Sequence, residues 1–147
     1  MGENSFFIYD GAVREIQCDV HDFVYDNLNV PGRKACWGGH NSNFNELWWG
    51  FPVGSSQYLP NKYVIWNYRE NTWAIGSLDR GCWIDQGVFD FPIAGDSSGF
   101  IYQHESTTLN ASPNLGTSVP FCTTGPIELG NGDNYVQCNQ IIPDEEA

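Results

Sequence analysis

The chain alternates short β-branched and aromatic runs with polar turn signals, and this alternation predicts strands rather than helices. The run KYVIWNY is followed by Arg69-Glu70-Asn71 and then by TWAIGS, which is the pattern of a tight hairpin. ELWWGF before it predicts a third strand, and KACWGG predicts a fourth. We therefore expect an antiparallel four-stranded meander over residues 34–77, the unit from which a β-propeller blade is built.

Strand signals also lie on both sides of the meander. FFIYD at residues 6–10 predicts a strand, and the period-two alternation of residues 13–28 predicts two more before a loop at 29–33. Residues 81–91 and 99–105 start a further unit. No window carries the sustained i, i+3, i+4, i+7 apolar stripe of an amphipathic helix. The sequence thus predicts an all-β fold, with no long helix before Thr107.

The apolar period disappears at residues 107–116 (TTLNASPNLG), and strand-like stretches follow before a polar end. We expect residues 1–106 to form propeller blades, and 107–147 to form a linker and terminal strands that lead out of the propeller. Aromatic-plus-turn units recur about every 40 residues, which supplies about three blades, whereas a closed propeller needs roughly four to eight. We therefore expect a partial propeller, either a truncated or split gene product or an arc that another chain completes.

Tryptophan provides the predicted core. Trp48 and Trp49 are adjacent, so on a strand they point to opposite faces, one into the core and one toward a neighbouring sheet or solvent. Together with Trp66, Trp73 and Trp83 they form the predicted structural core, because each aromatic ring buries a large area. If one of the paired tryptophans were exposed, it would offer a stacking platform for a sugar.

The charge of the chain is strongly negative, with 6 Lys plus Arg against 18 Asp plus Glu and a formal net charge of −12. Phosphate contacts need cationic side chains, so this balance argues against binding to the nucleic-acid backbone. It suits either simple solubility or a conduit wall that repels DNA. Five cysteines without paired spacing fit a reduced, cytosolic chain. No apolar run long enough for a membrane span occurs.

One pattern mimics a zinc site. Cys18-x2-His21 and Cys36-x3-His40 are separated by fourteen residues, in the outline of a two-cysteine, two-histidine ligand set. On a strand, however, Cys18 and His21 point to opposite faces. The second pair lies among glycines rather than on a helix. We therefore expect cysteines that act as small core residues, and no bound metal.

Catalytic patterns are weak. The carboxylate pairs Asp19/Asp22 and Asp85/Asp90 could serve as an acid and a nucleophile, but each lies in or beside a turn, where Asp is common for conformational reasons. His104 is a lone histidine beside a strand aromatic, which indicates a structural role. A nucleophile elbow and a phosphate-binding glycine loop are both missing from the sequence. We expect no enzymatic activity and no cofactor.

Several segments, taken in order, resemble the propeller domain of tail nozzle proteins of short-tailed bacteriophages, also called tail tubular B or packaged-DNA-stabilisation-type proteins. The segments that carry this resemblance are 5–29, 46–49, 63–68, 71–73, 79–80, 97–106 and 125–146. They span nearly the whole chain. No single motif among them is diagnostic, and their joint occurrence carries the resemblance.

The resemblance implies a non-enzymatic structural component of the phage tail, part of a ring through which DNA is retained and ejected. Expected partners are other phage tail proteins (tube or adaptor, and fibre) and copies of the chain itself. DNA would pass without specific binding. The expected location is the virion tail, after assembly in the host cytoplasm. The alternative is a carbohydrate- or protein-binding β-propeller module.

Overall fold

A computed structural model describes residues 1–106 and residue 123, and the chain divides into two compact units, Met1–Leu109 and Asn110–Ala147. The described part is β-rich, and every pairing of its strands is antiparallel. No helix in it is long and apolar enough to cross a membrane. The predicted linker and terminal strands at 107–147 lie outside the described residues, apart from residue 123.

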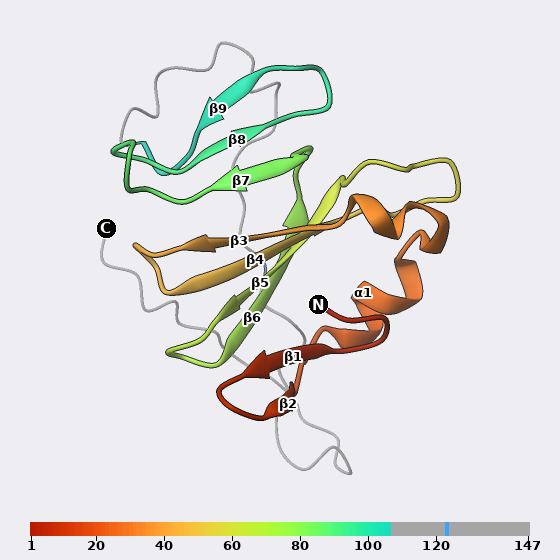
Figure 1. The fold of residues 1–147 in the computed structure, drawn as a ribbon. Coiled ribbons are helices and arrows are strands. Elements are labelled where there is room, and N and C mark those ends of the chain that lie inside the picture. The colour runs from red at the N-terminus through yellow and green to blue at the C-terminus, as the bar shows by residue number, and fades with distance from the viewer. Residues whose placement is uncertain (107–122, 124–147) are drawn as a thin grey trace, which may run out of the picture. The chain divides into compact units, whose positions relative to one another are not determined.

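The predicted meander is confirmed. Its strands are β3 (Trp37–Asn41), β4 (Glu46–Phe51), β5 (Lys62–Asn67) and β6 (Thr72–Ser77), and they pair in sequence order (Figure 1). The last hairpin turns where the sequence predicts. Asn67 Oδ1 accepts hydrogen bonds from the backbone N–H groups of Arg69 and Glu70, and Asn71 takes a left-handed φ of 54°. Asparagine suits both roles, which explains the precise turn.

The N-terminal region contains a helix where the sequence predicts a strand. β1 (Phe6–Tyr9) and β2 (Val13–Ile16) form the expected hairpin, but residues 21–27 form α1 (His21–Asn27). Val20, Val24 and Leu28 are spaced by four residues, and all three pack in the core. In so short a segment the apolar residues fit the period of a strand and that of a helix equally well. Packing of these residues in the core selects the helix.

The predicted loop at 29–33 is replaced by a short 3₁₀ helix, η1 (Val30–Ala35), with proline in its first turn. Proline is favoured there because its fixed φ suits a helix start and its missing N–H is not needed. Residues 6–29, predicted to form strands of the propeller blades, are therefore a two-stranded hairpin followed by a helix. This corrects the prediction for residues 6–29.

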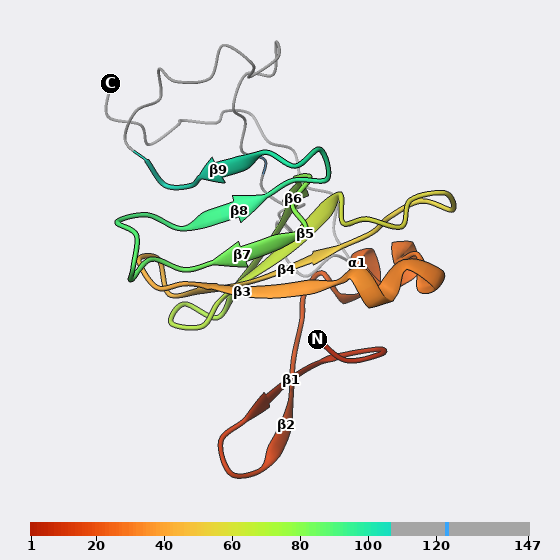
Figure 2. The same cartoon turned by 45° about the horizontal axis from the view of Figure 1, so that its top comes forward.

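The second sheet has three strands, β7 (Cys82–Ile84), β8 (Ile93–Gly95) and β9 (Ile101–Gln103). It lies beside the meander through contacts between β7 and β3 (Figure 2). The described residues thus form antiparallel sheets of two, four and three strands. They form no closed barrel or propeller, so only the antiparallel β architecture of the predicted fold is confirmed.

Candidate functional site

The two faces of the meander are both covered by other elements. On one face Trp49 packs against Phe6 of β1, with ring centroids 4.9 Å apart, beside the buried residues Val24, Phe51 and Val64. On the opposite face, Trp48 stacks on Trp83 of β7 at 5.1 Å. The predicted opposition of Trp48 and Trp49 is therefore confirmed.

The remaining tryptophans of the predicted core differ in burial. Trp48 and Trp66 are buried, each 8% exposed, whereas Trp49, Trp73 and Trp83 are half-buried. Trp66 stacks on Trp73 at 5.9 Å, and their indole N–H groups donate to Asn71 Oδ1 and to the Gln17 carbonyl. Each indole donor therefore has an acceptor, as a packed Trp requires.

Trp37 also belongs to the aromatic cluster formed by Trp48 and Trp83, although the predicted core does not include it. It stacks parallel to Trp83 at 6.1 Å, and its indole N–H donates to the Arg80 carbonyl at 2.5 Å. A Cβ on Gly50, which pairs with Trp37 across the strands, would come closer than 3.0 Å to the Trp37 ring. Glycines on the strands beside aromatics are the sequence signal that could have identified this residue.

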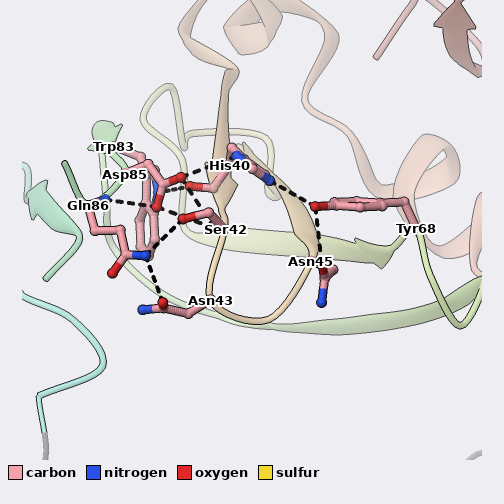
Figure 3. Close-up of polar contacts among 8 residues, drawn as sticks. All are labelled: His40, Ser42, Asn43, Asn45, Tyr68, Trp83, Asp85 and Gln86. Carbon is pink, nitrogen blue, oxygen red and sulfur yellow. Dashed lines mark hydrogen bonds and ion pairs between the residues drawn. The ribbon is translucent and has the colours of Figure 1, made fainter.

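A polar network joins the meander to the segment after β7 (Figure 3). His40 on β3 lies at its centre. His40 Nδ1 is 3.2 Å from Asp85 Oδ2, and Nε2 is 3.2 Å from the Tyr68 hydroxyl. The Trp83 indole N–H donates to the His40 carbonyl at 2.8 Å. Residues from two other stretches of sequence, one at Tyr68 and one at 83–85, therefore converge on His40.

The carboxylate of Asp85 holds the β3–β4 turn in place. It accepts hydrogen bonds from the backbone N–H of Ser42 at 3.2 Å and from that of Gln86 at 2.8 Å. The Gln86 amide N–H₂ donates to Ser42 Oγ at 3.1 Å and to Asn43 Oδ1 at 2.7 Å. These charge-assisted and neutral bonds fix the turn between β3 and β4.

The network resembles a catalytic triad only in part. Asp85 and His40 have the spacing of a base and its orienting carboxylate, but Ser42 Oγ contacts Gln86 and not His40 among the described residues. The hydroxyl at His40 belongs to Tyr68. A triad needs the nucleophile within hydrogen-bond reach of the base. This geometry supports loop positioning rather than serine chemistry.

The two carboxylate pairs considered in the sequence, Asp85/Asp90 and Asp19/Asp22, lie in different surroundings. Asp85 is engaged in the network, while Asp90 is exposed. Asp19 and Asp22 are also exposed, and Asp22 contacts the neighbouring His21. The absence of enzymatic activity stays a prediction.

The four residues of the zinc-like pattern have separate partners. His21 Nε2 lies 2.8 Å from the Asn4 carbonyl, and His40 is engaged by the polar network. Burial raises the pKa of the Cys18 and Cys36 thiols, which disfavours the thiolate that a metal needs. Among the described residues, no group of three or more potential ligands is placed to hold a metal.

His104 packs against Trp83 of the aromatic cluster. Its ring lies 4.8 Å from Trp83, and Arg80 Nε–H donates to His104 Nε2 at 3.0 Å. Burial and the Arg80 charge lower the pKa of His104 to about 4. The Arg80 guanidinium also lies over the Tyr102 ring at 3.9 Å. This arrangement fits the structural role predicted for His104.

The second sheet leaves one face exposed. Trp83, Ala94 and Tyr102 pair across its strands and share a face, on which Ala94 is buried against the rest of the protein. Alternation therefore places Ile84 and Ile101 on the opposite face, where they are 61% and 77% exposed. Val88 and Phe89 of the following loop are also exposed, and together with Ile101 they line a depression of about 450 Å³. Contiguous exposed apolar surface of this kind is typical of an interaction site.

No family model, curated protein or solved structure matches this chain.

Proposed function

We propose that the protein is a non-enzymatic structural component of a bacteriophage tail, part of the nozzle ring through which DNA is retained and ejected. The proposal starts from the ordered resemblance to tail nozzle proteins of short-tailed phages, which is carried by segments 5–29, 46–49, 63–68, 71–73, 79–80, 97–106 and 125–146. The described part of the chain supports it with an antiparallel four-stranded meander.

One observation carries the proposal. The meander is covered on both faces, and the next sheet stacks on it through Trp83 while its own outer face, with Ile84 and Ile101, stays exposed. Propeller blades stack face to face in the same way, so a terminal blade needs a neighbour. A partial propeller completed by further copies or by other tail proteins of the tube, adaptor or fibre satisfies that need.

The charge is consistent with a conduit for DNA. A chain with a net charge of −12 has few cations with which to hold phosphates. In the nozzle, DNA would pass without specific binding, and the protein would reside in the virion tail after assembly in the host cytoplasm.

Sedimentation velocity over a range of protein concentrations tests the assembly. The wild-type chain should form oligomers, and Ile101→Asp should shift it toward the monomer because it places a charge on the exposed sheet face. Val13→Asp is the matched control, since Val13 is also an exposed strand residue, 68% exposed, but lies on β2. A wild-type protein that remains monomeric at every concentration would contradict the proposal.

The location needs its own test. An epitope tag on the chain should be found by immunogold labelling at the tail tip of particles of the phage that encodes it. A filter-binding assay with the purified protein should retain little duplex DNA at physiological salt. Tagged chain that is missing from purified particles would contradict a virion role.

A further inference from the structure

A second feature lies at the tips of two hairpins, away from the exposed sheet face. The β3–β4 turn and the β5–β6 turn line an open pocket of about 500 Å³. This volume lies within the range of roughly 300–1,000 Å³ that small-molecule sites occupy. Its walls combine asparagine amides, two carboxylates, a guanidinium and one aromatic ring: Asn43, Asn45, Asn67, Glu46, Glu70, Arg69 and Phe44.

The polar network orients two of these amides. Gln86 donates to Asn43 Oδ1 at 2.7 Å, and the Tyr68 hydroxyl donates to Asn45 Oδ1 at 3.4 Å. Both amide oxygens are therefore occupied as acceptors, and the N–H₂ ends are turned away from these partners (Figure 3). The network thus orients both amides and leaves their N–H₂ groups without a partner among the described residues, so two residues that line the pocket have free donors.

Hydrogen-bond acceptors and an aromatic ring also line the pocket. The Glu70 carboxylate has no partner among the described residues, and Glu46 uses one oxygen, Oε2, to accept from the Trp48 indole. Phe44 lines the same pocket and is 49% exposed, so part of its ring meets solvent. A phenyl face carries partial negative charge and attracts C–H groups.

We propose that this pocket binds a neutral saccharide of one or two rings. A sugar hydroxyl both donates and accepts, so neighbouring hydroxyls match the amide donors of Asn43 and Asn45 and the carboxylate acceptor of Glu70. The C–H face of the ring would lie on Phe44. Two carboxylates against the one guanidinium of Arg69 disfavour acidic sugars.

This inference differs from the sugar site that the sequence suggested at Trp48 or Trp49. Trp48 is buried in the stack with Trp83, and Trp49 packs on Phe6. The hairpin-tip pocket uses neither residue. It also does not depend on the proposed role in a phage tail.

Ligand-observed NMR with the full-length protein is the test. The probes are glucose, galactose, mannose, N-acetylglucosamine, lactose and maltose, with glucuronic acid and sialic acid as acidic comparisons. We expect saturable binding of at least one neutral probe at about 10 mM, well above a weak Kd of about 1 mM. Binding of acidic probes alone, or of none, would overturn the proposal.

Variants locate the site. Asn45→Asp keeps the acceptor for Tyr68 but removes the donor, and it suits the left-handed φ of 58° at this position. We expect it, and likewise Phe44→Ser, to weaken binding about ten-fold. Phe100→Ser is the matched control, because Phe100 is 64% exposed and lies outside the pocket. Equal affinity in the wild type and both pocket variants would overturn the proposal.

A further variant guards against misfolding. If Phe44→Ser or Asn45→Asp lowers the melting temperature, Glu70→Ala replaces it, since Glu70 is an exposed turn residue. We expect Glu70→Ala to melt like the wild type and still to lose binding several-fold. Undiminished binding in that variant would contradict the assignment of Glu70 to the site.

Discussion

The indole ring of Trp83 lies against the backbone of Gly39, so close that a Cβ at Gly39 would come within 3.0 Å of the ring, a separation that real Cβ atoms essentially never show. The same ring stacks on Trp48 and Trp37. The contact between the two sheets therefore depends on a residue without a side chain on β3 and on a large aromatic residue on β7.

Gly39→Ala should destabilise the protein by about 1–3 kcal/mol, because the added methyl group must displace a packed indole. Urea unfolding followed by tryptophan fluorescence measures the loss. Gly81→Ala is the control, since its Cβ would have nothing closer than the Gly95 carbonyl at 4.0 Å. Equal stability of the two variants would show that Trp83 does not pack on Gly39.

Truncation of the buried tryptophan should cost more. Trp48→Ala should lower the free energy of unfolding by about 3–5 kcal/mol, since it leaves a cavity between the two sheets. Trp73→Ala should cost less, because Trp73 is only half-buried. Chemical denaturation of both variants at one temperature gives the comparison. A loss within experimental error for Trp48→Ala would contradict its place in the core.

His104 should make stability depend on pH. Its folded-state pKa of about 4 lies below the ordinary value of 6.5, so the unfolded chain binds a proton first as the pH falls. The contribution of neutral His104 is complete above about pH 6.5 and is lost as the pH falls toward 4. Because the ring is partly solvated, we expect a loss on the order of 1 kcal/mol.

His104→Gln provides the control for that measurement, since the Gln side chain can still accept from Arg80 without titrating. His21 works in the opposite direction, because Asp22 and the Asn4 carbonyl raise its pKa and its contribution is lost as the pH rises. The difference between wild type and His104→Gln between pH 7 and 4.5 isolates His104. Parallel stability curves for the two proteins would contradict the prediction.

Metal removal should have no effect. The purified protein should contain no stoichiometric zinc, and a chelator should leave its melting temperature unchanged, because Cys18, His21, Cys36 and His40 do not converge on one point. Elemental analysis and thermal melts check this. One zinc per chain that disappears in Cys36→Ser would overturn the prediction.

The sequence by itself determined the local architecture of the meander. Alternating β-branched and aromatic residues defined the four strands, and Asn67 and Asn71 specified the last turn through contacts within a few residues. The opposition of Trp48 and Trp49 followed from strand geometry alone. Each of these features depends on neighbours along the chain.

Tertiary structure decided the rest. Residues 21–27 satisfied two periods, and packing of Val24 in the core selected the helix. His40 meets Asp85, and Gly39 meets Trp83, across more than forty residues of sequence. No local pattern marks such pairs, because their proximity results from how one sheet stacks on another. The hairpin-tip pocket has a different origin, because strand order within one sheet brings the β3–β4 and β5–β6 turns to the same end of the meander.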